Sequence, residues 1–249
     1  MLTEERKAYI LKELAQRHTI KTSDLVLETQ TSESTIRRDL KELEQDGQLK
    51  RVHGGASTLF HLNTELSMSE KADLYLVEKK AIARSAAQLI EPNDIVYLDA
   101  GSTTYEMLPF ILRTDIRIVT NSIVHAHYLA QHQIPAIMIG GRLKLSTQAI
   151  IGSESVKQLG QYHFSKAFMG MNGVHHQYGF TTPDEEEATV KATAMRQSSQ
   201  CFVLADHSKF EALSFSKVAN LEEAKIITDV LPEKWHTLYQ DTTVTEVSL

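Results

Sequence analysis

The stretch from Ser34 to Ala56 combines a helical period with a tight turn, and it constrains the N-terminal part of the chain strongly. Ile36, Leu40 and Leu43 recur three or four residues apart, which predicts an amphipathic helix with one buried stripe. We expect this helix over residues 33–46. A basic run follows and leads into two consecutive glycines, which predict a turn. The segment is therefore predicted to be a helix followed by a basic hairpin.

The polar face of the predicted helix carries hydroxyls and cations. Arginine matches the edge of guanine with two hydrogen bonds, and hydroxyls and cations bind phosphate oxygens. An isolated charged run is often only a solvated surface, and that alternative remains open on charge alone. The interpretation that we favour is contact with double-stranded DNA through Ser34, Thr35, Arg37, Arg38, Lys41, Lys50, Arg51, His53 and Gly54.

Two further helices are predicted ahead of this one. The first runs from Thr3 to about Arg17, and the second begins at Thr22 or Ser23. Three short helices and a basic hairpin within residues 1–57 predict a winged helix-turn-helix domain. In helix-turn-helix proteins the second helix of the motif enters the major groove. Residues 58–75 show no clear period and predict a linker, and residues 76–249 predict a second domain.

The second domain alternates strands with helices. Alternation of this kind favours a parallel sheet covered by helices on both faces. The whole chain is therefore predicted to be an α+β two-domain protein with a Rossmann-like α/β C-terminal domain. The predicted strands are 95–98, 116–120, 136–139, 167–170, 202–205 and 225–228. The predicted helices are 76–90, one through Met107, Leu108 and Ile111, one ending near His132, and 185–198.

Polar residues follow most of these strands directly, where ligands bind in open parallel sheets. In the first such loop Gly101 allows close approach of the backbone, hydroxyls follow, and a helix begins. That combination suits a phosphate monoester. The loop has no lysine, which excludes a Walker A loop, and it lacks the glycine spacing of a dinucleotide site. The predicted effector-binding residues are Asp99, Gly101, Ser102, Thr103, Thr104, Asn121, Ser122, Arg142, Asn172, Glu187, Lys191 and Lys209.

Each of these residues also has a simpler interpretation. Loops between strands and helices are polar in any such sheet, and some of these side chains are expected only to cap helices. Arg142 and Lys209 supply countercharge for a phosphate or are surface cations. Glu187 and Lys191 lie four residues apart, so they form a surface ion pair or both face the sheet edge and bind sugar hydroxyls.

No metal and no cofactor are predicted. His125, His127 and His132 lie close in sequence, but no cysteine or carboxylate joins them at the spacing of metal ligands. We expect them, and the pair His175–His176, to be solvent-exposed. Cys201 is the single cysteine, which excludes an intrachain disulfide and fits a reducing compartment. Its apolar neighbours predict a place in the core.

Charge and hydropathy limit the partners. The net charge of −6 does not indicate nucleic-acid binding, and cations balance carboxylates within residues 1–56, so only a local patch can drive DNA binding. The chain begins with charged residues rather than a signal peptide, and no apolar run approaches membrane-spanning length. We therefore expect a cytoplasmic protein without a membrane partner.

Several segments resemble the DeoR family of bacterial transcriptional repressors. The matching segments of the first domain are ERKAYILKEL, SESTIRRDLKELEQDG and LKRVHGGA. Those of the second resemble the sugar-phosphate-sensing domain and are LDAGSTTYEM, VTNS, IGGR, FMGMNG, YGFTTPDEEEATVK and VLADHSKF. The resemblance covers nearly the whole chain. It implies that Ser34, Thr35, Arg37 and Arg38 face the operator and that Arg51 to Gly55 forms the wing.

The same resemblance implies a sensor fold similar to ribose-5-phosphate isomerase and an effector that is a phosphorylated sugar or polyol. YGFTTPDEEEA and GGRLKLSTQAIIG look most like repressors of fructose operons, which implies fructose 1-phosphate as the effector. Repressors of lactose-phosphotransferase systems are the nearest alternative.

Two functions of different classes follow. The first is a transcriptional regulator whose DNA binding is controlled by a sugar phosphate, and it is expected to be a homodimer or homotetramer because operators pair half-sites. The second is a sugar-phosphate isomerase with an accessory N-terminal module. An isomerase needs a positioned carboxylate base, for which Asp99 and Glu187 are the candidates. The winged domain has no role in that alternative.

Overall fold

The computed structural model describes residues 3–17, 19–46, 48–52, 54–57, 67–111 and 113–249. The chain divides into two compact units, Met1–His61 and Leu62–Leu249. Of the predicted linker, residues 58–66 lie outside the described part. The segment after them is folded, since α4 (Met68–Ala72) has Ser67 as its N-cap, and the backbone N–H of Met68 donates to Ser146 O at 2.9 Å.

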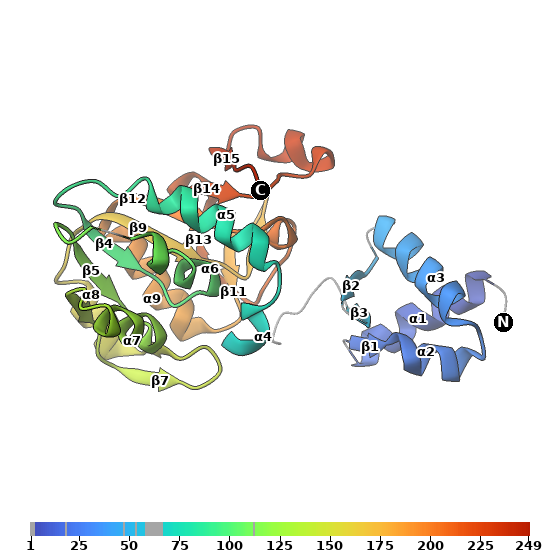
Figure 1. Ribbon diagram of the computed structural model, residues 1–249. Coiled ribbons are helices and arrows are strands. Elements are labelled where there is room, and N and C mark those ends of the chain that lie inside the picture. Colours follow the sequence, from blue (N-terminus) through green and yellow to red (C-terminus); the bar gives the residue numbers. More distant parts are fainter. Residues whose placement is uncertain (1–2, 18, 47, 53, 58–66, 112) are drawn as a thin grey trace. The chain divides into compact units, whose positions relative to one another are not determined.

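The first unit is three helices and a small antiparallel sheet (Figure 1). Its core holds the three apolar residues of the predicted stripe, Ile36, Leu40 and Leu43, packed with residues of the two earlier helices. The sheet has the order β1-β3-β2, and β1 was not predicted. The elements are α1 (Thr3–Arg17), β1 (Thr19–Lys21), α2 (Thr22–Thr29), α3 (Glu33–Gln45), β2 (Lys50–Val52) and β3 (Gly55–Ser57).

The second unit is built on a parallel sheet with strand order β15-β14-β12-β9-β4-β5-β6. All six predicted strands are present in it, and β15 is an addition. The strands are β4 (Ile95–Leu98), β5 (Arg117–Thr120), β6 (Ala136–Met138), β9 (Phe164–Gly170), β12 (Ser198–Leu204), β14 (Lys225–Thr228) and β15 (Val244–Glu246). Cys201 of β12 is buried as predicted, and burial raises the pKa of its thiol to about 11.

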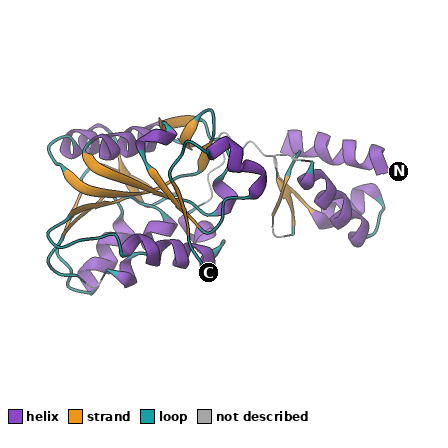
Figure 2. Cartoon of the chain, turned by 90° about the horizontal axis from the view of Figure 1, so that it is seen from above, coloured by secondary structure: helices purple, strands orange, loops and turns teal. Residues whose placement is uncertain are grey.

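Helices cover both faces of this sheet, as Figure 2 shows from above. Val96 and Leu98 pack against the helices of one face, whereas Tyr97 between them packs against those of the other. The first face is covered by α5 (Leu76–Ala87), α6 (Ser102–Tyr105) and α7 (Ile123–Gln131). The second is covered by α8 (Ser153–Leu159) and α9 (Glu185–Arg196).

One helix prediction is wrong in extent. The helix expected to run through Met107, Leu108 and Ile111 stops at Tyr105, and a short 3-10 helix, η1 (Leu108–Phe110), follows. Pro109 gives the reason, because it lacks the N–H that would donate to the Tyr105 carbonyl in a continuous α-helix. A helix as short as α6 contributes little dipole, which removes part of the argument for phosphate binding at this loop.

Several short antiparallel strands were not predicted. They are β7 (Arg142–Lys144), β8 (Ala149–Ile151), β10 (Gly173–His175), β11 (Gly179–Thr182) and β13 (Ser216–Ala219). Three further 3-10 helices are η2 (His207–Lys209), η3 (Leu221–Glu223) and η4 (Glu233–Tyr239). None of the helices in the described part of the chain has the length and apolar character needed to cross a membrane.

Candidate functional site

The N-terminus of α3 presents a cluster of hydroxyl groups. Ser32 caps the helix, and its Oγ accepts from the backbone N–H of Thr35 at 3.3 Å. The same oxygen lies 3.0 Å from Ser34 Oγ and 2.8 Å from Thr35 Oγ1. Hydroxyls beside the free amides of a helix N-terminus are suited to a phosphate of the DNA backbone.

Arg37 and Arg38 project from the outer surface of α3, as predicted. The Arg37 guanidinium donates to Glu33 Oε1 at 2.9 and 2.7 Å, and Arg38 Nε donates to Glu42 Oε1 at 3.1 Å. The two arginine side chains are 67% and 81% exposed. Exposed pairs within a helix contribute only a few tenths of a kcal/mol. Either guanidinium can therefore exchange its carboxylate for DNA at small cost.

A buried ion pair sets the position of α3 and was missed in the sequence. The Arg6 guanidinium of α1 donates through Nε and Nη2 to the Asp39 carboxylate of α3, with 3.1 Å from Nη2 to Oδ1. Both side chains are buried. Lys7 adds a pair with Glu42 at 3.0 Å. These contacts hold α3 against α1 while its other face stays exposed.

The hairpin β2–β3 forms the predicted wing, and both glycines at its turn have a physical role. Gly54 has a φ of +77°, which glycine adopts without strain. A Cβ on Gly55 would lie 2.1 Å from the Ile20 carbonyl oxygen of β1, so only glycine fits there. The backbone N–H of Arg51 donates to Glu44 Oε1 at 2.7 Å, which joins the wing to α3.

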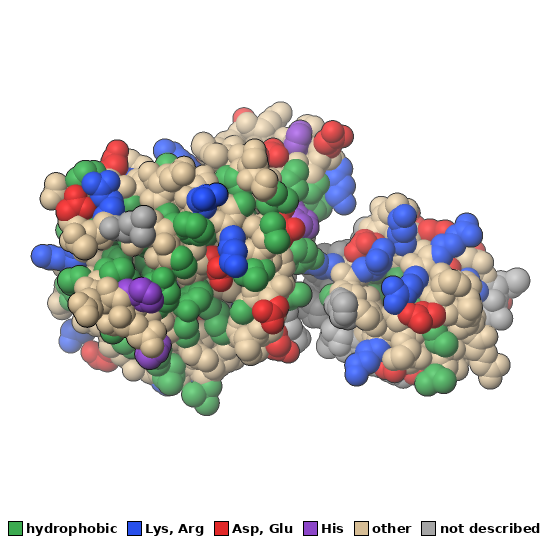
Figure 3. Space-filling view, viewed as in Figure 1, with side chains coloured by type: hydrophobic (Ala, Val, Ile, Leu, Met, Phe, Trp, Pro, Cys, Tyr) green, Lys and Arg blue, Asp and Glu red, His purple; other side chains and the backbone are tan. Residues whose placement is uncertain are grey.

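The exposure of the remaining predicted DNA contacts varies. Lys41 and Arg51 are exposed and Lys50 is half-buried, whereas His53 lies outside the described residues. Figure 3 shows Lys and Arg side chains interspersed with Asp and Glu on the visible face of this unit. The visible charges of this unit are therefore mixed in sign, in agreement with the balanced charge of residues 1–56.

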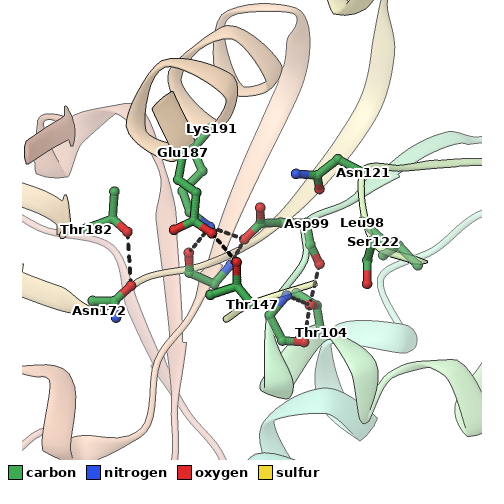
Figure 4. A network of polar contacts seen from close by, with 12 residues as sticks. Leu98, Asp99, Thr104, Asn121, Ser122, Thr147, Asn172, Thr182, Glu187 and Lys191 are labelled. Atoms are coloured by element: carbon green, nitrogen blue, oxygen red, sulfur yellow. Dashed lines mark hydrogen bonds and ion pairs between the residues drawn. The ribbon is translucent and has the colours of Figure 1, made fainter. Parts of the chain in front are cut away.

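In the second unit, a buried ion pair lies at the carboxyl ends of β4 and β9 (Figure 4). The Lys191 ammonium of α9 pairs with Asp99 Oδ2, and it also donates to the Gly170 carbonyl at 3.0 Å. The backbone N–H of Gly170 donates to the same Asp99 oxygen at 3.0 Å. Both charged side chains are nearly inaccessible to solvent. Lys191 therefore faces the sheet edge and is not part of a surface pair.

Glu187, one turn before Lys191, is held by the hairpin β7–β8. Thr147 Oγ1 donates to its Oε1 at 2.6 Å, and Lys144 Nζ lies 3.2 Å from its Oε2. Glu187 is buried. Neither Thr147 nor Lys144 was predicted. The hairpin thus packs against α9, and the interval of four residues along this helix places Glu187 beside Lys191 (Figure 4).

The loop after β4 is tightly packed on itself. Thr104 is completely buried, and its Oγ1 donates to Asp99 O at 2.6 Å and accepts from Gly101 N at 3.0 Å. A Cβ on Gly101 would lie 3.4 Å from Gly170 Cα, an ordinary van der Waals contact, so the loop after β4 packs directly against the end of β9. The Thr104 hydroxyl is therefore used inside the loop. Ser102 is half-buried and Thr103 is buried.

The loop after β5 contributes a buried amide whose oxygen is not satisfied. Asn121 Nδ2 donates to the Ile150 carbonyl at 3.1 Å, whereas its Oδ1 has no hydrogen-bond partner among the described residues. Ser122 caps α7 by accepting from the backbone N–H of His125 at 3.3 Å. At the carboxyl end of β11, which belongs to a different sheet, Thr182 Oγ1 donates to Asn172 Oδ1 at 3.1 Å.

The expectation of solvent-exposed histidines is wrong for His125. Its ring is buried, with Nδ1 2.6 Å from Ser122 Oγ and Nε2 3.2 Å from Thr104 Oγ1. Burial lowers the pKa of His125 to about 3, so the ring is neutral and links two loops of the candidate site. His127 and His132 are exposed as expected. The pair His175–His176 is half-buried, which also contradicts the expectation.

Arg142 and Lys209 occupy more accessible positions. Arg142 is exposed and pairs with Glu186. Lys209 Nζ lies 3.8 Å from the buried carboxylate of Asp206. A second lysine, Lys79 of α5, was not predicted. Its pKa is lowered to about 8 by burial and by the nearby charge of Lys209, so two cations share this part of the molecule.

Comparison with known proteins gives the family. Residues 6–59 match the family model described as the DeoR-like helix-turn-helix domain, and residues 75–230 match the DeoR C terminal sensor domain. The chain belongs to the DeoR family of transcriptional regulators. It is 45% identical, over 99% of both chains, to a Bacillus subtilis protein named uncharacterized HTH-type transcriptional regulator FruR.

Two further relatives are repressors by name. The HTH-type transcriptional repressor GlcR of Bacillus subtilis is 35% identical over 94% of this chain and 91% of its own. The lactose phosphotransferase system repressor of Streptococcus mutans is 34% identical over 92% and 93%. A solved ribose 5-phosphate isomerase A of Methanocaldococcus jannaschii has a TM-score of 0.40 and 17% identity over 53% of each chain. This DeoR-family chain is a transcriptional regulator and not a sugar-phosphate isomerase.

Proposed function

We propose that this DeoR-family regulator represses a sugar-utilisation operon from double-stranded operator DNA, and that fructose 1-phosphate releases it. The names of the relatives support this choice, since one is FruR and two are repressors, one of them of a sugar phosphotransferase system. In this proposal the exposed face of α3 and the wing contact the DNA. We further propose a cytoplasmic location, where operator DNA is accessible.

The observation that carries the proposal is the buried polar cluster of Asp99, Lys191 and Glu187. Buried charges are costly unless they are paired, and they concentrate at functional sites. Here Asp99 follows β4 while Glu187 and Lys191 come from α9, and they meet at the carboxyl end of a parallel sheet, where such folds bind ligands. In the proposal Asp99 and Glu187 accept hydrogen bonds from sugar hydroxyls and Lys191 donates one.

We propose that the phosphate of the effector lies beside the loop after β4. Ser102 and Thr103 supply hydroxyls there, and Gly101 keeps the loop free of a side chain. Lys209 and Arg142 supply the countercharge from the accessible side. Thr104, Ser122 and Asn172 shape the loops that carry these groups, since their side chains already bond within the protein.

A ligand changes DNA binding only if it binds two conformations with different affinity. We propose that the sugar phosphate favours a conformation of the sensor unit in which paired DNA-binding units no longer match two half-sites. Paired half-sites require more than one chain, so the proposal includes a homodimer or homotetramer. Sedimentation of the protein bound to DNA as a strict monomer would contradict this part.

The experiment measures release of the full-length protein from a DNA fragment that the protein has itself selected from a random pool. Fructose 1-phosphate, fructose 6-phosphate, tagatose 6-phosphate, fructose and inorganic phosphate are each titrated against the complex. We expect release by fructose 1-phosphate and not by fructose or phosphate alone. Failure of every phosphorylated sugar to release the DNA, or equal release by fructose, would refute the proposal.

A variant pair connects release to the polar cluster. Lys191→Met removes the buried ammonium, and Lys157→Met changes an exposed lysine of α8 as a matched control. Lys191→Met is expected to lose release, while the control behaves as the wild type. Because the substitution leaves the buried Asp99 carboxylate without its partner, it also destabilises the sensor unit, so release is compared at a temperature where the Trp235 fluorescence shows that this unit is folded. Normal release in Lys191→Met would show that the effector binds elsewhere.

A further inference from the structure

Two histidines and a glutamate converge where the hairpin β10–β11 meets the segment after η2. His175 ends β10, His176 follows in the turn, and Glu211 comes from the other segment. Glu211 Oε2 lies 2.9 Å from His176 Nδ1 and 3.8 Å from His175 Nε2. One donor atom from each of the three residues falls within 4.8 Å of the others, and all three side chains are half-buried.

The Glu211 carboxylate is oriented by bonds to its other oxygen. Oε1 accepts from the Tyr239 hydroxyl at 2.8 Å and from the backbone N–H of His176 at 3.2 Å. Oε2 is thereby turned toward both imidazole rings. A neighbour that orients a ligating carboxylate in this way is typical of metal sites.

The backbone at Glu211 is in an unfavourable conformation. Its φ is +58°, in the left-handed region that costs a residue with a side chain about 1–2 kcal/mol. The conformation is held by a bond from the backbone N–H of Glu211 to Val174 O at 2.7 Å. Strained residues of this kind gather at functional sites, and here the strain directs a carboxylate at two imidazoles.

We propose that His175, His176 and Glu211 bind a divalent transition-metal ion of the zinc type, with water as the fourth ligand. Nitrogen and oxygen ligands lie about 2.0–2.2 Å from zinc, so two ligands of a tetrahedral site are about 3.4 Å apart. The observed separations of 2.9 and 3.8 Å lie on either side of that value. Imidazole and carboxylate together favour zinc over magnesium or calcium, which prefer all-oxygen sites.

Binding requires one ring proton to move on each histidine. His176 Nδ1 lies 2.9 Å from the acceptor Glu211 Oε2 and therefore carries the ring proton, which moves to Nε2 when Nδ1 binds the ion. His175 Nδ1 accepts from the backbone N–H of Gln177 at 3.1 Å, which places the ring proton on Nε2. When Nε2 binds the ion, the proton moves to Nδ1 and the bond to Gln177 is lost. Gln177 is exposed, so its N–H bonds to water instead and the cost is small.

The position of the ion gives it a structural effect on the sensor unit. β10 begins directly after Asn172, and Glu211 lies two residues beyond Lys209. An ion that joins β10 to Glu211 would fix the relative position of the two segments that carry these residues. The metal site is inferred from the arrangement of His175, His176 and Glu211, so this proposal does not depend on the identity of the effector.

The test uses the full-length protein after treatment with EDTA and dialysis. Zinc binding is measured by calorimetry, and the visible absorption of Co²⁺ reports the geometry of the site. Glu211→Gln keeps the shape and an acceptor for Tyr239 but removes the ligating oxygen, and His176→Gln removes a nitrogen. The matched control is His127→Gln, which changes an exposed histidine of α7.

We expect one ion per chain in the wild type and a loss of affinity of about tenfold or more in both variants, with the control unchanged. The thermal midpoint in EDTA checks that the variants fold, and His175→Gln replaces either variant that does not. Absence of saturable zinc binding in the wild type would overturn the proposal, as would wild-type affinity in the ligand variants.

Discussion

Substitution of Asp39 by alanine tests how the recognition helix is held in place. The buried pair of Arg6 and Asp39 connects α1 to α3, and the two side chains are 7% and 3% exposed. Removal of one partner from a buried pair leaves an uncompensated charge and costs about 3–5 kcal/mol. A domain of about 60 residues, at about 0.05–0.15 kcal/mol per residue, has a total stability of about 3–9 kcal/mol. Asp39→Ala therefore removes most of the stability of the first unit.

The chain offers a convenient assay. Trp235, the single tryptophan, lies in the second unit, so its fluorescence follows the unfolding of that unit alone. Far-ultraviolet circular dichroism reports the loss of α1, α2 and α3. In urea titrations we expect Asp39→Ala to lose helical signal at low denaturant, with the Trp235 transition unchanged. Binding to selected DNA should be lost although every exposed side chain of α3 is retained.

Two further variants separate this explanation from others. Glu33→Ala removes the exposed partner of Arg37 and should cost less than about 0.5 kcal/mol. Arg6→Met combined with Asp39→Leu replaces the pair by apolar side chains and should restore folding, because apolar replacements of buried pairs are often neutral or stabilising. A cost below about 1 kcal/mol for Asp39→Ala, or an equal shift of the Trp235 transition, would refute the reasoning.

Three other predictions concern DNA, effector and pH. Arg37→Ala should lose discrimination at one base position in a selection experiment, whereas Lys50→Ala should weaken binding to all sequences and flatten the salt dependence of the affinity. Lys209→Ala should bind DNA normally and lose effector-induced release in the titration with fructose 1-phosphate. His207 and Asp229 are joined by a hydrogen bond of 2.6 Å, which raises the pKa of the His207 imidazole. Burial of Asp229 raises the pKa of its carboxylate, but the hydrogen bonds from His207 outweigh this effect, so the pKa of Asp229 is lowered. The pair therefore stabilises the fold above about pH 4, and this contribution is lost as the pH rises through the raised pKa of His207. Thermal midpoints of wild type and Asp229→Asn should accordingly converge toward alkaline pH.

The regular elements of the fold follow from local patterns. The helix carrying Ile36, Leu40 and Leu43 was predicted from its period, and the strand 95–98 from an apolar run with a polar loop behind it. The short strands β7, β8 and β10 have three residues each, too few to show a period of two. Their pairing depends on contacts that local patterns do not contain.

The positions of Asp99, Glu187 and Lys191 near the strand ends were predicted from the sequence, but their bonded partners were not. The interval of four between Glu187 and Lys191 is visible in the sequence, but the partner of Lys191 is Asp99, 92 positions away. The position of Asp39 in the sequence indicates a buried ion pair. It lies three residues after Ile36 on the buried stripe of the helix, and a charge on such a stripe requires a buried partner. That partner, Arg6, is 33 positions earlier.

The two units use ion pairs in opposite ways, and this difference bears on how a ligand can act. On α3 the guanidiniums of Arg37 and Arg38 are exposed, so in the proposed complex DNA would replace their carboxylates at little cost. In the sensor unit Asp99 and Lys191 are buried and already bonded, so a ligand that merely exchanges those bonds gains little. The unsatisfied oxygen of Asn121 is different, because a hydroxyl that reaches it removes an existing penalty. We therefore propose that this oxygen adds to the selectivity among sugars that Asp99, Glu187 and Lys191 provide, while the phosphate supplies affinity.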